Sequence, residues 1–190
     1  MLTTSALFRL LLQKGWIVNE NEISDEFFMA EALRHAEIAL ASNEFPVGCV
    51  MVYHHQIVAI GSREGTRASN TNEIDHAEMV ALRRLNRLPY PVEVKKITAY
   101  CTLEPCMMCF GALLISGIHR IVYAYEDAMG GGSRCDLNSL TPLYRNAPVI
   151  VIPHVLRKNS LRLFKTYFDN PSHTYLSNTY LADYTRKQIL

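Results

Sequence analysis

The sequence has almost no net charge and no long apolar run. Its 19 basic and 18 acidic residues leave a formal charge of +1, which argues against binding through a strongly positive overall field but leaves local basic patches possible. The apolar stretch at residues 6–16 contains Arg9 and is too short to span a bilayer. We therefore expect no membrane partner, and charge neither indicates nor excludes nucleic acid.

The sequence has few cysteines, and their number is odd. Five cysteines in 190 residues are a poor basis for a disulfide framework and fit the reduced thiols of the cytoplasm better, which makes metal binding a hypothesis to test. Residues 1–23 are interpreted as an extension that begins with a helix. An organellar presequence is the alternative, because residues 1–18 contain Arg9 and Lys14 and no acidic residue.

The chain shows no division into parts. With 49% apolar and 19% charged residues it has the composition of a globular protein. Neither an internal repeat nor a long linker is present, so we expect residues 1–190 to form one domain. Residues 1–23 are its N-terminal extension, and residues 170–190 are a C-terminal tail whose polar, tyrosine-rich sequence predicts nothing specific.

Helical and strand patterns alternate along the chain. Residues 24–41 predict an amphipathic helix capped by Ser24, and residues 47–62 predict a β-hairpin with His54 and His55 at its tip. The apolar face of that helix is expected to be Phe27, Ala30, Leu33, Ile38 and Ala41. Further helices are predicted from residue 76, at 106–117 and at 156–168, and further strands at 94–102, 120–125 and 148–153. This alternation indicates a layered α/β domain with helices on both faces of one sheet.

Cys106 and Cys109 carry the clearest chemical signal. Their spacing of three places both thiols on one face of the predicted helix, and Pro105 favours a helix start, where thiolates are stabilised. His76 opens another predicted helix and offers a neutral imidazole as third ligand. Three ligands on zinc leave the fourth position to water, as in catalytic sites. Glu78 would then lie beside that water and move its proton.

The pattern H-x-E followed by P-C-x-x-C is the signature of zinc nucleobase deaminases, and "HAE" at 76–78 and "PCMMC" at 105–109 match it without a gap. The sequence thus resembles the cytidine/deoxycytidylate deaminase superfamily. Its segments "EFPVGCVMV", "HAEMVAL" and "TLEPCMMCFGALL" look most like those of bacterial tRNA-specific adenosine deaminases. The resemblance extends from about residue 27 to about residue 133.

The resemblance implies a three-layer α/β/α fold on a five-stranded mixed sheet, and a homodimer. It implies that His76, Cys106 and Cys109 bind Zn²⁺ and that Glu78 is the catalytic proton shuttle. Asp127 matches an acidic residue that lies near the substrate ribose in the tRNA enzymes. The whole set of expected substrate-binding residues is Ala77, Pro105, Phe45, Pro46, Val47, Arg63 and Asp127.

One departure from that family concerns substrate recognition. Arg63 stands where those enzymes usually carry an asparagine whose amide recognises the base, and "NEID" at 72–75 replaces their usual run before the His-Ala-Glu. Asn70 and Asn72 are candidates to supply the missing amide, and Arg63 itself is a candidate to meet a phosphate.

The implied function is hydrolytic deamination of adenosine to inosine in tRNA. The alternative substrate is a free base, nucleoside or nucleotide of the guanine, cytosine or adenine type, favoured by Arg63 and the modest charge. A noncatalytic zinc-binding partner subunit is a third hypothesis, and the retention of Glu78 argues against it.

Simpler interpretations of the same residues remain open. The C-x-x-C pair alone fits a redox site, although H-x-E adds nothing to dithiol exchange. A structural zinc site needs a fourth ligand, for which Cys101, His119 and Cys135 are the candidates. Cys49 and Cys101 are otherwise expected to be core residues. A solvated basic face or an RNA-binding patch would contain Arg83, Arg84, Arg87, Lys95 and Lys96.

Overall fold

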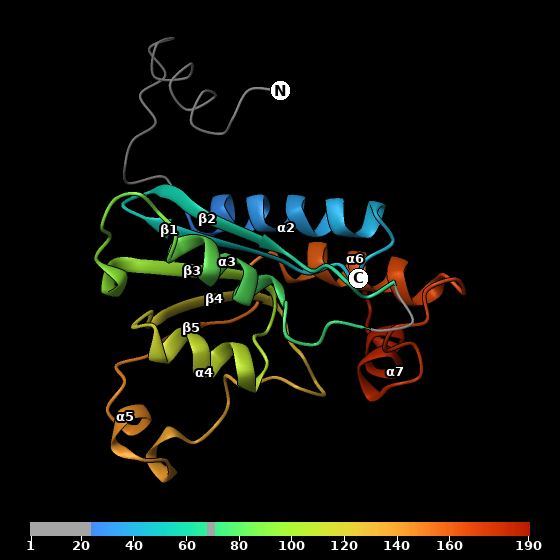
Figure 1. Ribbon diagram of the computed structural model, residues 1–190. Coiled ribbons are helices and arrows are strands. Elements are labelled where there is room, and N and C mark those ends of the chain that lie inside the picture. The colour runs from blue at the N-terminus through green and yellow to red at the C-terminus, as the bar shows by residue number, and fades with distance from the viewer. Residues whose placement is uncertain (1–23, 68–70) are drawn as a thin grey trace.

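A five-stranded sheet forms the centre of the molecule (Figure 1). The computed structural model describes residues 24–67 and 71–190, so the helix expected within residues 1–23 lies outside the described residues, as does Asn70. The strands are β1 (Gly48–Tyr53), β2 (Gln56–Ser62), β3 (Ile97–Leu103), β4 (Arg120–Tyr125) and β5 (Ile150–Ile152), in the order β2-β1-β3-β4-β5. β1 is antiparallel to β2 and β3, whereas β3, β4 and β5 are parallel. The predicted mixed sheet is confirmed.

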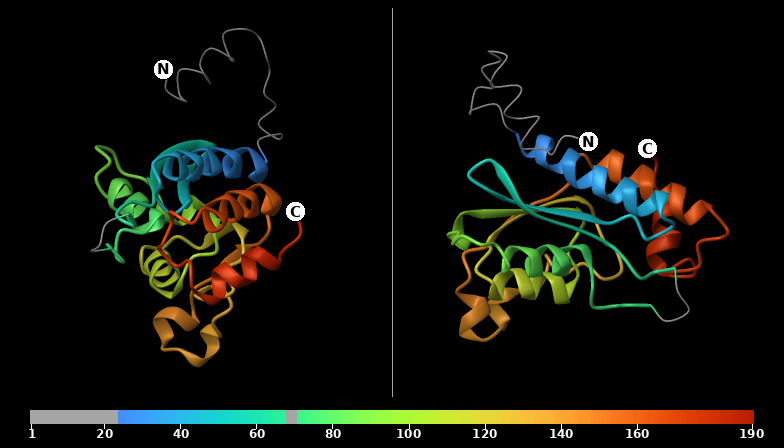
Figure 2. Two further views of the ribbon diagram at one scale, coloured as in Figure 1. Left: turned by 90° about the vertical axis from the view of Figure 1, so that its right-hand side faces the viewer. Right: turned by 45° about the horizontal axis from the view of Figure 1, so that its top comes forward.

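Helices cover both faces of this sheet. α2 (Asp25–Ala41) and α6 (Arg157–Asp169) lie next to each other on one face (Figure 2). α3 (Ala77–Leu85) and α4 (Met107–Ile115) lie on the other. Strand residues alternate between the two layers: Val50 packs in the α2 cluster, and its neighbour Cys49 packs in the α3 and α4 cluster. The three-layer α/β/α fold is confirmed.

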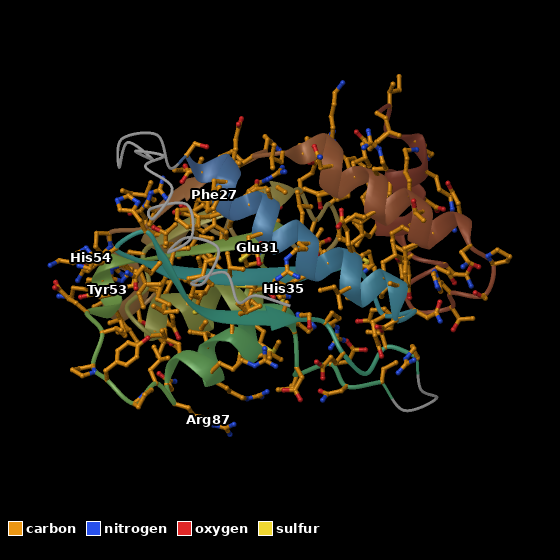
Figure 3. The ribbon with its side chains drawn as sticks, turned by 90° about the horizontal axis from the view of Figure 1, so that it is seen from above. Phe27, Glu31, His35, Tyr53, His54 and Arg87 are labelled. Atoms are coloured by element: carbon orange, nitrogen blue, oxygen red, sulfur yellow. The ribbon has the colours of Figure 1, made fainter. Side chains whose placement is uncertain are left out.

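The buried face of α2 differs from the predicted one. Of the five residues expected to face the core only Leu33 is buried, and Phe27 is 55% exposed. In Figure 3, Phe27, Glu31 and His35 follow one another along α2 in the view from above. Two faces of α2 carry enough apolar residues to pack against the sheet. Close contact with β1 selects one of them, because a side chain at Gly48 would lie 2.8 Å from the backbone nitrogen of Ala36. The buried residues are Phe28, Met29, Ala32, Leu33, Ala36 and Ala39.

The hairpin and the later strands follow the predicted pattern with shifted ends. His54 and His55 form the two-residue tip, with φ angles of 46° and 60°. Residues 94–96, expected at the start of a strand, form a 3-10 turn before β3, and β5 is shorter than predicted. Two short elements, a 3-10 turn at Leu137–Ser139 and α5 (Pro142–Arg145), lie between β4 and β5. None of the helices in the described ranges has the length and apolarity needed to cross a membrane.

The C-terminal tail is part of the core, which its sequence did not indicate. Residues after Pro171 lead into α7 (Tyr180–Lys187), whose Leu181 and Ala182 are fully buried. The hydroxyls of Tyr125, at the end of β4, and Thr185 lie 3.1 Å apart. α7 therefore packs against the C-terminal end of β4. The loop that contains Asp127 begins at the same end of the strand.

Candidate active site and metal centre

Two helix starts bring the predicted metal ligands together. His76 and Cys106 are the residues that precede α3 and α4, each with an extended backbone, and their carbonyls accept the first helical hydrogen bonds, from Val80 and Phe110. α3 follows the loop after β2, and α4 directly follows β3, so the fold places both helix starts at one end of the sheet. Neither side chain caps its own helix, and the His76 and Cys106 side chains instead lie within contact distance of each other.

The distances between the ligand atoms fit a tetrahedral zinc ion. Nδ1 of His76 lies 3.6 Å from Sγ of Cys106 and 3.5 Å from Sγ of Cys109. A zinc ion about 2.3 Å from sulfur and about 2.0 Å from nitrogen separates those atoms by about 3.5 Å at tetrahedral angles. The three ligand atoms all lie within 4.8 Å of one another. Two sulfurs and one imidazole are a donor set that zinc prefers.

Within residues 24–67 and 71–190, no fourth His, Cys, Asp or Glu joins this cluster. Cys101, His119 and Cys135 were the candidates for a closed structural site, and none of them belongs to it. Cys101 is instead buried, with its sulfur 3.9 Å from that of Cys49. The cluster therefore has the three-ligand composition of an open, catalytic site.

Hydrogen bonds among the two thiols and the imidazole shift the pKa values of these groups in different directions. Hydrogen bonds from Cys109 and His76 lower the pKa of Cys106 to about 4, although burial opposes the shift. The pKa of Cys109 is raised by its hydrogen bond to Cys106 and by burial. The Cys106 sulfur also raises the pKa of His76. Cysteine binds zinc as a thiolate and histidine binds it as a neutral imidazole, so a metal ion that binds here would displace the protons of these groups.

Glu78 lies beside the metal cluster without belonging to it. The residue is in the first turn of α3, is 3% exposed, and accepts a hydrogen bond from the Cys109 thiol at 3.5 Å. Burial is the main cause that raises the pKa of its carboxyl group. A carboxyl group that takes up a proton more readily than usual is suited to general acid–base chemistry near neutral pH.

A cavity of about 210 Å³ opens onto this cluster. Phe45, Val47, Ala77, Arg63 and Asp127, all expected to bind substrate, line it. Pro46 and Pro105 are buried next to lining residues but do not line it themselves. Glu73, from the unusual run at 72–75, also lines it. Sequence patterns did not indicate the other lining residues, which are Leu103, Glu104, Met129, Gly130, Tyr175, Leu176 and Leu181.

The loop after β4 holds Asp127 in the cavity wall. Its carboxylate accepts hydrogen bonds from the backbone of Gly130 at 2.9 Å and of Met129 at 3.0 Å. Burial raises the pKa of Asp127 despite these bonds. Buried Glu104 anchors the same loop, since it accepts hydrogen bonds from the backbone of Asp127 and the hydroxyl of Ser133.

Arg63 and Asn72 bond to the loop between β2 and α3. The Arg63 guanidinium is 3% exposed and donates to the carbonyls of Asn72 at 2.5 Å and Asp75 at 3.2 Å. The side-chain amide of Asn72 donates to Asp75 at 2.7 Å, and its oxygen accepts from the backbone of Ile74 and Asp75. Asn72 does not line the cavity, so in this conformation it does not replace the missing base-binding amide.

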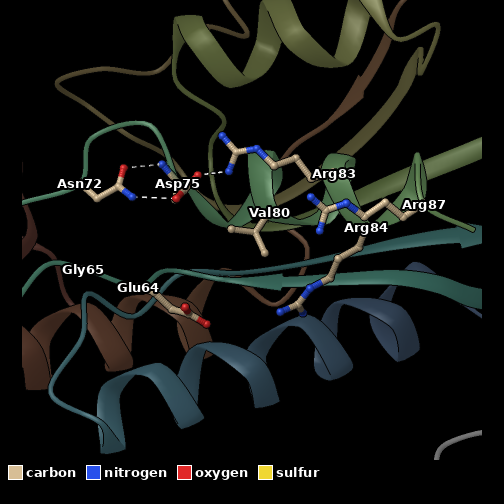
Figure 4. Close-up of a pocket in the computed structure, with 8 residues that line it drawn as sticks. All are labelled: Glu64, Gly65, Asn72, Asp75, Val80, Arg83, Arg84 and Arg87. Carbon is tan, nitrogen blue, oxygen red and sulfur yellow. Dashed lines mark hydrogen bonds and ion pairs between the residues drawn. The ribbon is translucent and has the colours of Figure 1, made fainter.

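A second hollow, of about 410 Å³, lies on the outer side of α3 (Figure 4). Arg83, Arg84 and Arg87 project into it, with Arg83 paired to Asp75 and Arg84 bonded to the Ile60 carbonyl at 2.9 Å. It is larger than the cavity at the metal cluster but contains none of the three metal ligands. The reaction chemistry therefore belongs to the smaller cavity, and the larger hollow is an arginine-rich surface.

An open three-ligand cluster with an adjacent carboxyl group is the arrangement of hydrolases that activate water, and its H-x-E and P-C-x-x-C residues are those of nucleobase deaminases. The chain is thus a deaminase by its fold and site. Residues 22–125 match the family described as "cytidine and deoxycytidylate deaminase zinc-binding region". The chain belongs to this family, and the match includes both motifs.

Several tRNA-specific adenosine deaminases are similar to the chain. The protein of that name from Streptococcus pyogenes serotype M18 is 32% identical over 142 residues, which are 75% of this chain and 88% of the relative. Its Bacillus subtilis counterpart is 31% identical over 144 residues, which are 76% and 88% of the two chains. A solved structure from work on A-to-I editing by tRNA:A34 deaminases has a TM-score of 0.55 and 27% identity, and the match covers 72% of this chain and 98% of that one.

Proposed function

We propose that the protein is a zinc-dependent hydrolase that converts adenosine to inosine in tRNA. The observation that carries the chemistry is the cluster of His76, Cys106 and Cys109, at distances that fit zinc, with Glu78 buried beside it. The substrate assignment rests on the tRNA-specific adenosine deaminases that match three quarters of the chain.

His76, Cys106 and Cys109 would hold the zinc ion. When bound in such a site, zinc lowers the pKa of a water ligand to about 7 and so supplies a hydroxide at neutral pH. Glu78 would take one proton from the attacking water and pass it to the ring nitrogen of the base, and would then move the water's second proton, from the newly added hydroxyl group, to the departing amino group. Water adds to the carbon that carries the amino group, ammonia leaves, and the base keeps the oxygen. Phe45 and Val47 supply an apolar wall for the base.

The arginine-rich hollow on α3 supports an RNA substrate. Arg83, Arg84 and Arg87 outnumber the two acidic residues that line the same hollow, Glu64 and Asp75, in a chain with a net charge of +1. Such a local patch can bind phosphates without a strongly basic protein overall. Lys95 and Lys96, the other residues of the possible RNA-binding patch, are both exposed but do not line this hollow.

Deamination of a free base, nucleoside or nucleotide is the second candidate, and Arg63 at the place of the usual asparagine is the observation that favours it. The donors of Arg63 already meet loop carbonyls, Glu73 and Tyr175, which favours a nucleoside or base over a nucleotide. A noncatalytic zinc protein is the third candidate, and the buried position of Glu78 beside the ligands counts against it.

One experiment separates these three functions. Protein of measured zinc content is incubated with tRNA and, separately, with a panel of bases, nucleosides and nucleotides, and ammonia release is followed. The tRNA is also sequenced for A-to-G conversion. We expect conversion in tRNA. Ammonia from the panel alone would support the second function, and a zinc-loaded protein that is silent on every substrate would support the third.

We also propose a cytoplasmic homodimer. The five cysteines are unpaired, as in a reducing compartment, and the family resemblance suggests a dimer whose second subunit completes the pocket. Sedimentation at several protein concentrations measures the assembly. A monomer that is fully active at every concentration would contradict the dimer.

A further inference from the structure

The C-terminal tail supplies part of the cavity wall. Residues 170–190 lie beyond the segment that matches the deaminase family, yet Tyr175 and Leu176 line the same cavity as His76 and Glu78. This wall is a structural contribution of the tail that neither the family match nor the sequence pattern indicates.

Both ends of the wall are fixed to the domain. On one side His173 is buried, its ring stacks on Tyr167 at 4.3 Å between centroids, and its Nδ1 lies 3.0 Å from the Tyr167 carbonyl oxygen. On the other side Leu181 of α7 is 1% exposed, and Arg186 donates to the carbonyl of Phe168 at 3.1 Å. Tyr175 is therefore held in place between two anchored segments.

Tyr175 connects this wall to the loop before α3. Its ring packs edge-on against Phe45 at 5.4 Å, and its hydroxyl donates to Oε2 of Glu73 at 2.8 Å. The same hydroxyl accepts a hydrogen bond from Arg63 at 3.1 Å, and the guanidinium carbon lies 5.5 Å from the ring centroid. A residue from the tail and two from the loop thus form one polar group at the cavity.

Within this group Arg63 has a positioning role. It is almost completely buried, and it donates to Glu73 at 3.3 Å as well as to two loop carbonyls. A buried guanidinium needs a counter-charge, and Glu73 supplies it. Burial raises the pKa of Glu73, but hydrogen bonds such as that from Tyr175, together with the charge of Arg63, outweigh it and lower the pKa, so the carboxylate is ionised at neutral pH.

Glu73 is the member of the group that remains open to a ligand. Its side chain is 56% exposed and lines the cavity, whereas the proposed ligands are half-buried (His76 and Cys106) or buried (Cys109). The base must enter toward the metal cluster for its amino carbon to react, so its sugar is expected on the exposed side of the cavity, where Glu73 lies. The Asp127 carboxylate in the same cavity already accepts two hydrogen bonds from its own loop. An ionised carboxylate accepts hydrogen bonds from hydroxyl groups and repels phosphate at the same place.

We propose that Glu73, held by Arg63 and Tyr175, accepts a hydrogen bond from the ribose 2′-hydroxyl of the nucleoside being deaminated, and so makes the enzyme selective for ribose. This inference rests on the proposed deaminase function. The 2′-hydroxyl is the group by which a protein distinguishes RNA from DNA at a given position, and the carboxylate at the rim would perform that distinction here.

The test compares two sugars on one enzyme. Wild-type protein and Glu73→Gln act on a tRNA anticodon stem-loop that carries either adenosine or 2′-deoxyadenosine at the edited position, and kcat/KM is measured for both. We expect the wild type to prefer ribose by about tenfold or more, the difference between a hydrogen bond to a charged group and none. Glu73→Gln is expected to lose more activity on ribose than on deoxyribose, so the ribose preference shrinks.

Two tyrosine variants show whether the tail acts through Glu73. Tyr175→Phe keeps the ring against Phe45 but removes the hydroxyl that holds Glu73, so its sugar preference should shrink in the same direction. Tyr180→Phe is the matched control, since Tyr180 belongs to the same tail, is 63% exposed and does not line the cavity. Its sugar preference should equal that of the wild type. Zinc content and thermal unfolding show that each variant is folded.

Ribose selectivity can be tested even if tRNA is not the substrate. If tRNA is not a substrate but a free nucleoside is, the same comparison is made with its ribose and 2′-deoxyribose forms. The inference is overturned if the wild type does not distinguish the sugars, if Glu73→Gln loses activity equally on both, or if the enzyme acts only on free bases, which have no sugar.

Discussion

At the scale of single residues, the proposed chemistry depends on which side chains form the three-residue cluster and which only lie beside it. His76, Cys106 and Cys109 converge because two of them precede a helix and the third follows within its first turn. Glu78 reaches the same place from the first turn of α3 but stays outside the ligand set. Replacing a proposed ligand and replacing the proposed proton shuttle, Glu78, should therefore cause different losses.

Replacing a ligand should remove the metal. Cys106→Ser is expected to bind far less zinc than the wild type, because a hydroxyl is a much weaker zinc ligand than a thiolate. Zinc content after dialysis, measured by atomic emission, gives the result. Cys135→Ser is the matched control, since Cys135 is unpaired and outside the cluster. Equal zinc loss in both variants would show that the site is not the three-ligand cluster described above.

Replacing the proton shuttle should leave the metal in place. Glu78→Gln keeps the shape of the side chain but cannot carry a proton, so kcat should fall by about 10²- to 10⁴-fold while zinc content stays at the wild-type level. Ammonia release and metal analysis on the same preparation give both values. Glu37→Gln, on the exposed side of α2, is the control and should retain activity. Full activity of Glu78→Gln would contradict the assigned role.

At the scale of elements, the position of α3 depends on close backbone contact with β2. A side chain at Gly61 would meet the carbonyl oxygen of Ala77 and would lie 2.8 Å from the backbone nitrogen of Ala81. Both contacts are with the backbone of α3, which cannot move without moving His76. The packing of one strand glycine therefore helps to set the geometry of the metal cluster.

Gly61→Ala should destabilise the protein by about 1–3 kcal/mol or more through overpacking, and should lower its zinc content as α3 shifts. Gly111→Ala is the matched substitution in α4, where an added methyl group meets no atom within 4 Å. It should be neutral or stabilising by up to about 1 kcal/mol, because alanine favours a helix. Urea unfolding of both variants measures the difference. Equal stability of the two would refute the close-contact explanation.

At the scale of the whole molecule, an ion pair joins the C-terminal helices to the sheet. Glu126, directly after β4, accepts hydrogen bonds from Nε of Arg157 in α6 at 2.8 Å and from the hydroxyl of Tyr184 in α7 at 2.8 Å. Burial raises the pKa of Glu126, but the bonds from Arg157 and Tyr184 outweigh it and hold the pKa below the usual 4.5. His154 lies 3.5 Å from the same carboxylate.

The lowered pKa predicts a specific pH dependence of stability. A carboxyl group with a folded pKa below its unfolded value stabilises the protein above the unfolded pKa, and this stabilisation is lost as pH falls through the folded pKa. Glu126→Gln should therefore lower the free energy of unfolding by about 1.5–3 kcal/mol at pH 7, and the gap to the wild type should close below about pH 4.5. Thermal unfolding from pH 7 to pH 3 measures the gap. A gap that does not change with pH would contradict this account.

Much of the fold and of the metal cluster could be predicted from short-range patterns. The spacing of Cys106 and Cys109, the His-Ala-Glu motif and the alternation of helices and strands depend on residues close together in sequence, where helix and strand geometry fixes which side chains share a face. The family resemblance then added the order of the layers. The rotation of α2 could not be predicted in this way, because two of its faces are apolar and only the fit against Gly48 selects one.

The sequence by itself determined the class of chemistry, because it contains a histidine, two cysteines and a glutamate in the spacings typical of zinc nucleobase deaminases. Only the tertiary structure decided what surrounds the substrate. Arg63, Glu73 and Tyr175 are up to 112 residues apart and share no local pattern. They meet because the buried leucine of α7 and the stacked histidine before it hold the tail against the loop, and such long-range packing depends on the whole core rather than on any one segment.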